Sequence, residues 1–356
     1  MNGPEDTAGP PPRANPALIG HAAAERTLRD ALDSGRLAHA WLISGPEGIG
    51  KATLAYRFAR FVLARGSKAA APAESLYLAP DHPVFRRVAA GGHSDLITAE
   101  RTVTDDGRLR GEIVVADIRA VVRFFKLTAG EGGWRVAVID GADTMNPNAA
   151  NALLKVLEEP PANSLLLLVA HNPGRLPPTL RSRCRKLALK PLAEAQVTAL
   201  LADYLPELAA DDAAALAHLA GGSPGRALAL AGEGGLELYR DISDILETLP
   251  QLDVQALHAF GGRFGRAGAE QAFRTAGDLI RWWLARTIVA AAGGPPSAAA
   301  AEAALIGRLA AAAGLDRWLE VWEKINRLLG RTETASLDRK QVVLNVFLAI
   351  EGAVRR

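Results

Sequence analysis

Cysteine is nearly absent from this 356-residue chain, which contains one, Cys184. A lone thiol excludes an internal disulfide and any zinc site built from several thiolates, and it fits a reducing cytosol. The sequence shows no basic start followed by an apolar core, as in a secretory signal, and no run of about 18 apolar residues that could span a membrane. It therefore predicts a soluble cytoplasmic protein with no membrane partner.

The chain also lacks an excess of charge of either sign. The 41 basic and 39 acidic residues leave a formal net charge of +2. The overall charge therefore neither requires nor excludes a nucleic-acid partner, and any basic surface must be local. The length is sufficient for two or three domains with a sizeable core.

Two segments lack the periodicity of helices and strands. Residues 1–16 are rich in Pro, Gly and Ala, which predicts a disordered tail. Residues 66–94 have a similar composition and contain His82 and His93. The spacing and number of candidate ligands do not fit a zinc site, so we interpret both histidines as surface residues.

Between these segments and residue 190, strand patterns alternate with helix patterns. Apolar runs predict buried strands at residues 40–44, 95–100, 136–139 and 164–170. Amphipathic periodicity predicts helices at 21–34, from Lys51, from about Asp117 to Phe125, and from an Asn146 cap to the Pro160-Pro161 stop. Asp106-Gly107 is typical of a hairpin turn. This alternation predicts a mostly parallel sheet with helices on both faces.

A glycine-rich loop follows the first predicted strand. Residues 45–53 read GPEGIGKAT and match the phosphate-loop pattern G-x-x-x-x-G-K. The glycines, Gly45, Gly48 and Gly50, let backbone N–H groups curl around phosphate oxygens, and the helix beginning at Lys51 points its positive end at them. The loop indicates a site for ATP or ADP, bound weakly or not at all. The alternative is a turn that only connects a strand to a helix.

The same loop lacks a group that hydrolysis needs. Ala52 stands where a Ser or Thr hydroxyl ordinarily ligates Mg²⁺, and Thr53, one residue later, points elsewhere on the helix. Asp140 ends a buried strand, where a second Mg²⁺-holding acid would lie. The alternative is that Asp140 binds no metal ion and only forms hydrogen bonds with a neighbouring loop.

Two motifs connect this chain to a known family. The run NALLKVLEEPP extends from Asn151 to Pro161, and the triplet Ser182-Arg183-Cys184 follows a second buried strand. Together they closely resemble the AAA+ clamp-loader subunits of bacterial replicases, and the resemblance covers roughly residues 17–235. It implies an α/β fold, with an AAA+ P-loop-type parallel sheet followed by a small helical lid and an all-α collar domain.

The resemblance divides the chain into an AAA+ α/β domain at 17–190, a helical lid at 191–235 and a helical collar at 236–356. The collar would be the oligomerisation domain, and Arg226 would occupy the second-sensor position of the lid. Many relatives carry a four-cysteine zinc module near residues 66–94. This chain has no cysteine there, so no zinc is expected.

In motor members of the family a glutamate follows the strand-end acid and polarises the attacking water. Here that position is Gly141, and Asp143 is displaced too far to replace it. His171 and Asn172 stand at the first-sensor position, where motor subunits more commonly have threonine. Together with the missing hydroxyl of the loop, these departures predict that the chain turns over no ATP in its own site.

Arg183 is the residue to which the resemblance assigns catalysis. In the family the arginine of this triplet points into the ATP site of a neighbouring subunit, where its fork of donors stabilises a transferring phosphoryl group. The alternative is that Arg181, Arg183 and Arg185 form an ordinary solvated basic stretch after a proline turn.

The resemblance therefore implies a stationary ring subunit that supplies Arg183 in trans, without independent activity, as an accessory to a DNA-directed DNA polymerase. Its implied partners are the motor subunits, the clamp-opening subunit, the sliding clamp and primer-template DNA, whose phosphates the exposed Lys155 could meet. Two alternatives remain: an ATP-hydrolysing motor subunit and a purely structural collar subunit.

Four tryptophans are expected in the collar core or at a subunit interface: Trp282, Trp283, Trp318 and Trp322.

Overall fold

The computed structural model describes residues 9–66, 74–103, 110–131, 133–266, 268–295, 300–335 and 337–355. The chain forms two compact units, residues 1–228 and 229–356, and each is described by itself. The predicted Asp106-Gly107 turn lies outside the described residues.

A five-stranded sheet organises the first unit. Its strand order is β2-β3-β4-β1-β5, and every pairing is parallel. The strands are β1 (Ala40–Ser44), β2 (Leu96–Ala99), β3 (Arg135–Asp140), β4 (Ser164–Ala170) and β5 (Arg185–Ala188). The central strands β1, β3 and β4 are almost continuously apolar because helices cover both faces of the sheet.

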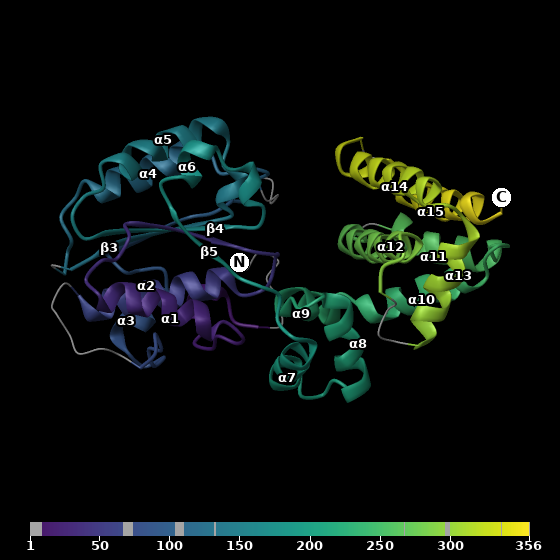
Figure 1. Cartoon of the computed structure of the whole chain (residues 1–356), viewed down its shortest axis with the longest axis horizontal. Coiled ribbons are helices and arrows are strands. Elements are labelled where there is room, and N and C mark those ends of the chain that lie inside the picture. The colour runs from purple at the N-terminus through teal and green to yellow at the C-terminus, as the bar shows by residue number, and fades with distance from the viewer. Residues whose placement is uncertain are drawn as a thin grey trace. The chain divides into compact units, whose positions relative to one another are not determined.

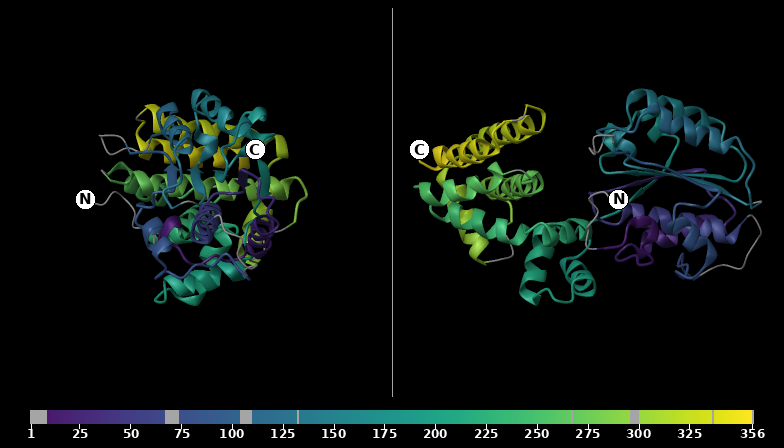
Figure 2. Two further views of the ribbon diagram at one scale, coloured as in Figure 1. Left: turned by 90° about the vertical axis from the view of Figure 1, so that its left-hand side faces the viewer. Right: turned by 180° about the vertical axis from the view of Figure 1, so that it is seen from behind.

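Successive strand residues point to opposite faces, and each face has its own helical layer (Figures 1 and 2). Trp41 and Ile43 pack on the layer of α1 (Ala22–Asp33), α2 (Lys51–Arg65) and α3 (Pro83–Ala89). Ala40 and Leu42 pack on the layer of α4 (Val115–Phe125), α5 (Pro147–Glu158) and α6 (Pro178–Arg181). The predicted parallel sheet with helices on both faces is confirmed.

Part of the predicted N-terminal tail has a defined structure. Residues 12–14 form the short helix η1, which packs against α2 and α3. The Arg60 guanidinium donates to the backbone oxygens of Arg13 (2.8 Å) and Asn15 (2.7 Å) and stacks 4.4 Å from the Phe85 ring centroid. Burial lowers the pKa of Arg60 to about 10. The prediction of disorder was wrong for residues 9–16, because donors on a distant helix bind their backbone.

The two histidines of the 66–94 segment are not equivalent. His82 begins α3, and its Nδ1 accepts a hydrogen bond from the N–H of Val84 at 3.2 Å. His93, predicted at the surface, is 5% exposed, and its Nδ1 accepts from the N–H of Asp95 at 3.1 Å. The interpretation of His93 as a surface residue was wrong, because His93 is hydrogen-bonded to a buried residue. The side chain of Asp95 is itself buried, and its carboxylate accepts hydrogen bonds from the N–H groups of residues 130 and 131.

Helices α7 (Glu194–Tyr204), α8 (Ala210–Ala220) and α9 (Pro224–Gly232) follow the sheet. Helices α7 and α8 pack against each other. Helix α8 ends at Gly221, whose φ of +58° is the left-handed conformation that favours glycine. The glycine-rich turn after it carries the chain into α9, which contains the division between the two units.

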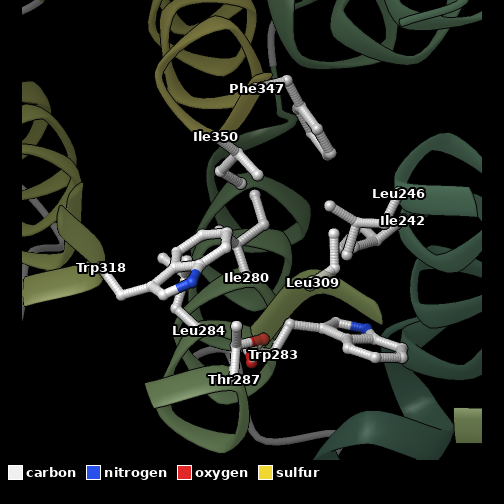
Figure 3. A pocket seen from close by; sticks show the side chains of 10 residues that line it. All are labelled: Ile242, Leu246, Ile280, Trp283, Leu284, Thr287, Leu309, Trp318, Phe347 and Ile350. Carbon is white, nitrogen blue, oxygen red and sulfur yellow. Dashed lines mark hydrogen bonds between the residues drawn. The ribbon is translucent and has the colours of Figure 1, made fainter. Parts of the chain in front are cut away.

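The described part of the second unit is helical, as the periodicity predicts, apart from the turns that join its helices. Its helices are α10 (Gly235–Glu247), α11 (Val254–Gly262), α12 (Glu270–Ala291), α13 (Ala300–Ala312), α14 (Leu315–Ala335) and α15 (Arg339–Val354). Trp283 and Trp318 are buried beside an apolar cavity of about 10 Å³, among aliphatic side chains of α10, α12, α13 and α15 (Figure 3). Trp282 and Trp322 are partly buried. No helix among the described residues is long and apolar enough to cross a membrane.

Candidate nucleotide site and exposed arginine

The phosphate-loop motif lies at the carboxyl end of β1, at the edge of the sheet where open α/β folds bind ligands. Gly45, Gly48 and Gly50 have φ values of +148°, +70° and +95°, which other residues adopt at a cost. A Cβ on Gly45 would lie 2.6 Å from the carbonyl oxygen of Leu189. A Cβ on Gly48 would lie 2.4 Å from the Oγ of Ser223. The motif therefore needs glycine both for its turn and for close packing.

Three consecutive carbonyl groups of the loop have hydrogen-bonded partners. The oxygen of residue 47 accepts from Ser223 Oγ at 2.8 Å, and that of residue 48 accepts from the N–H of Gly225 at 2.9 Å. The oxygen of Ile49 accepts from Nε2 of the buried His21 at 2.6 Å. The run Gly221-Gly-Ser-Pro-Gly225 thus braces the loop. No pattern in the sequence indicated that His21 has a role here.

Lys51, the lysine of the motif, is buried at 3% exposure. Its Nζ donates a hydrogen bond to the carbonyl oxygen of Pro46 within the loop. Burial lowers the pKa of Lys51, while the charges of Asp140, Glu47 and Asp143 act in the opposite direction. The ammonium is therefore held at the loop, and an incoming phosphate would compete with the Pro46 carbonyl for its donors.

Asp140 lies at the carboxyl end of β3, with Gly141 after it in the left-handed conformation at φ +75°. Burial raises the pKa of Asp140, and the charges of His171 and Lys51 oppose that shift. The tertiary structure thus brings together the strand-end acid and the loop lysine that the sequence selected. Gly141 has no side chain with which to polarise a water.

Asp143 binds the backbone at the end of β4 and is not placed as a catalytic base. Its carboxylate accepts hydrogen bonds from the N–H groups of His171 (3.1 Å) and Asn172 (2.8 Å), directly after β4. Burial acts to raise the pKa of Asp143, but these backbone hydrogen bonds and the charge of His171 hold it below its usual value. The carboxylate anchors the end of β4.

The two remaining candidate nucleotide contacts are Thr53 and Arg226. Ala52 follows Lys51 in the first turn of α2, and Thr53 is buried at 9% exposure. Arg226 lies in the first turn of α9, where its backbone N–H donates to Ser223 Oγ at 3.2 Å. Within the described residues, no group of three or more His, Cys, Asp or Glu side chains could hold a metal ion.

Arg183 lies two residues after α6, and its side chain is 37% exposed. Its Nη1 donates to the carbonyl oxygen of Thr179 at 2.9 Å. Its Nη2 forms an ion pair with Oε1 of Glu158 at 2.8 Å. The hydroxyl of Ser182 donates to the same Thr179 oxygen at 3.1 Å, so the first two residues of the triplet are anchored to one carbonyl group.

The neighbouring residues of the triplet have other environments. Nε of Arg181 is buried, and no hydrogen-bond partner for it lies among the described residues. The Arg185 guanidinium stacks 5.0 Å from the ring centroid of Trp41. Cys184 is buried, and burial raises its pKa to about 12, so it is a small apolar residue rather than a nucleophile. The three arginines are therefore not a uniform solvated stretch.

The sheet, the loop after β1, the acid at the end of β3 and the helices after the sheet define an AAA+ α/β protein of the P-loop type. The family model described as DNA polymerase III, delta subunit matches residues 20–193, just under half of the chain. The match contains the phosphate loop, Asp140 and the Ser182-Arg183-Cys184 triplet.

Curated relatives carry related names. The chain is 36% identical over 219 residues to DNA polymerase III subunit delta′ of Pseudomonas aeruginosa, covering 62% of this chain and 63% of that protein. It is 34% identical over 200 residues to subunit delta′ of Escherichia coli, covering 55% of each. It is 30% identical over 173 residues to subunit tau of Bacillus subtilis, covering 49% of this chain and 28% of that protein. The chain thus spans between 28% and 63% of the length of these relatives.

Among solved structures, a gamma subunit-related protein of DNA polymerase III from Thermotoga maritima is similar with a TM-score of 0.45 and 15% identity. The similarity covers 92% of this chain and all of that chain.

Proposed function

We propose that this chain is a delta′-like subunit of a DNA polymerase III clamp loader that turns over no ATP itself and supplies Arg183 to the ATP site of a neighbouring motor subunit. The relatives named delta′ and tau support a place in that assembly. The observation that carries the catalytic role is the position of Arg183, which is exposed and anchored at its own surface outside its own nucleotide loop.

The departures within the chain's own loop support the absence of turnover. Ala52 supplies no hydroxyl to a Mg²⁺ ion, and Gly141 supplies no carboxylate to a water. Asp143, the next acid, is bound to the backbone after β4. Nucleotide binding requires Lys51 to exchange the Pro46 carbonyl for a phosphate, which favours weak binding of ATP or ADP.

The partners of this proposal are gamma/tau-like motor subunits, a delta-like subunit, the sliding clamp and the primer-template DNA held by the assembled ring. The purified chain alone is expected to hydrolyse ATP no faster than a Lys51→Ala control. Steady-state turnover that disappears in Lys51→Ala would instead identify a motor subunit.

The arginine role is tested by reconstituting the ring with Arg183→Ala and measuring DNA-stimulated ATP turnover and clamp loading. Removing a phosphoryl-stabilising arginine typically costs on the order of a thousandfold at the affected site. An exposed arginine contributes about 0.5 kcal/mol or less to folding, so the free energy of unfolding is expected to be nearly unchanged.

Two variants serve as controls for this experiment. Arg183→Lys is expected to remain defective because a single ammonium lacks the planar fork of donors. Arg185→Ala removes an equal charge two residues away and is expected to keep near wild-type loading. Wild-type clamp loading by the Arg183→Ala ring would identify Arg183 as a solvated surface charge and refute the proposal.

A further inference from the structure

Glu158, the acid that pairs with Arg183, occupies an unfavourable place for a carboxylate. It is the last residue of α5, and Glu159 follows as the C-cap. The carboxyl end of a helix carries partial negative charge, which destabilises nearby acids. The Glu158 side chain is also 51% exposed, so it is not there to supply a hydrogen-bond acceptor to a buried donor. Its position needs an explanation other than helix stability.

The ion pair joins the two motifs of the first unit, although its two residues are 25 positions apart in the chain. Glu158 is the first glutamate of the NALLKVLEEPP run, and Arg183 is the centre of the triplet. The carboxylate holds Nη2 at 2.8 Å while Thr179 holds Nη1 at 2.9 Å. One guanidinium is thus fixed from two elements, the end of α5 and the first turn of α6.

Two anchors still leave donors for a ligand. Guanidinium has five N–H groups, and within the described residues the hydrogen bond to Thr179 uses one of them while Nη2 faces the Glu158 carboxylate in an ion pair. Exposed ion pairs contribute little to folding. The contact therefore acts on orientation: it restricts a long, flexible side chain to one direction before a ligand arrives, so less conformational entropy is lost when the ligand binds.

We propose that Glu158 is the positioning residue of Arg183, holding the guanidinium in place at the surface so that its remaining donors meet the phosphates of the neighbouring subunit's nucleotide. This inference rests on the proposed function. Glu158 does not touch the reacting atoms, and its effect is transmitted through Arg183. A small misplacement of a catalytic group can reduce a rate about a hundredfold, so a lost anchor should reduce turnover without abolishing it.

The test uses the fully assembled ring carrying Glu158→Gln, which keeps the shape of the side chain but removes the charge that attracts the Arg183 guanidinium. The matched control is Glu159→Gln, which removes the same charge from the same helix end. We expect Glu158→Gln to lower the kcat of DNA-stimulated ATP hydrolysis about tenfold, with KM for ATP unchanged, and Glu159→Gln to match wild type. A kcat for Glu158→Gln equal to that for Glu159→Gln would overturn the positioning role.

A double variant separates positioning from an independent structural effect. Adding Glu158→Gln to Arg183→Ala is expected to lower kcat no further than Arg183→Ala alone, because the group being positioned is already absent. A further loss in the double variant would show that Glu158 acts elsewhere and would refute the inference. If Arg183→Ala itself leaves kcat unchanged, the proposed function fails and the positioning role fails with it. A defective Arg183→Ala ring with a normal Glu158→Gln ring overturns the positioning role alone.

Discussion

At the scale of single residues, one close constraint is the contact between Gly48 of the loop and the turn that begins α9. A Cβ on Gly48 would meet Ser223 Oγ at 2.4 Å and the backbone nitrogen of Arg226 at 3.1 Å. Reciprocally, a Cβ on Gly225 would lie 3.0 Å from the Cα of Gly48. Two backbones therefore touch here, and neither position has room for a side chain.

Gly48→Ala is expected to destabilise the first unit by more than its backbone conformation alone requires. The positive φ of +70° costs an L-residue about 1–2 kcal/mol, and displacing the Ser223 hydroxyl adds an overpacking cost of about 1–3 kcal/mol. The measurement is the free energy of unfolding in urea.

Gly35→Ala provides the matched control for that experiment. Gly35 follows α1 with a nearly equal φ of +68°, but no atom lies within 4 Å of an added Cβ. It is expected to lose only the conformational contribution of about 1–2 kcal/mol. Equal losses for Gly35→Ala and Gly48→Ala would mean that the loop and the turn at Ser223 do not constrain each other in solution.

At the scale of elements, helix α5 carries Glu158, the residue proposed to position Arg183. It begins at Asn146, whose Oδ1 accepts the N–H of Ala149 at 2.9 Å, and it ends at Glu158. Its apolar face, including Leu153 and Leu157, is buried against the sheet and α4. The same helix is therefore fixed by a cap at one end and presents the Arg183 anchor at the other.

Asn146→Ala is expected to lower the free energy of unfolding by about 1 kcal/mol, because it leaves a backbone donor of the first turn without its capping acceptor. Chemical denaturation of the variant measures this loss. Asn151→Ala on the exposed face of the same helix is the control, expected within about 0.5 kcal/mol of wild type. A loss for Asn151→Ala as large as that for Asn146→Ala would show that the cap is not the cause.

At the scale of the whole molecule, each unit has its own apolar core. The first unit buries two clusters, one on each face of the sheet, and the second buries Trp283 and Trp318 among its own helices. These two tryptophans are therefore core residues. Exposed apolar side chains in the second unit include Leu315 and Leu319, one turn apart on α14, and Leu348 on α15.

Deleting residues 236–356 is expected to leave a folded α/β unit that fails to join the motor subunits. Because the sheet and both of its helical layers lie before residue 229, their packing does not need the deleted helices. Circular dichroism and a cooperative thermal transition test the folding of the truncated chain, and co-purification with motor subunits tests assembly. Recovery of the truncated chain in the ring at full yield would contradict the role of the collar.

Local sequence patterns determined the elements of this protein and the content of its nucleotide loop. The buried strands, the Asn146 cap, the glycines of the loop and Asp140 at a strand end follow from periodicity, capping and turn chemistry, which act between residues a few positions apart. The predicted parallel sheet followed because strand–helix alternation has few alternative arrangements.

Only the tertiary structure decided what surrounds those residues. Ser223 reaches the loop from 176 positions away, and Glu158 is separated from Arg183 along the chain by β4 and α6. The ordering of residues 9–16 by Arg60 and the burial of His93 were likewise invisible in composition. Contacts between residues so far apart depend on the path of the whole chain, and a local period or composition carries no information about that path.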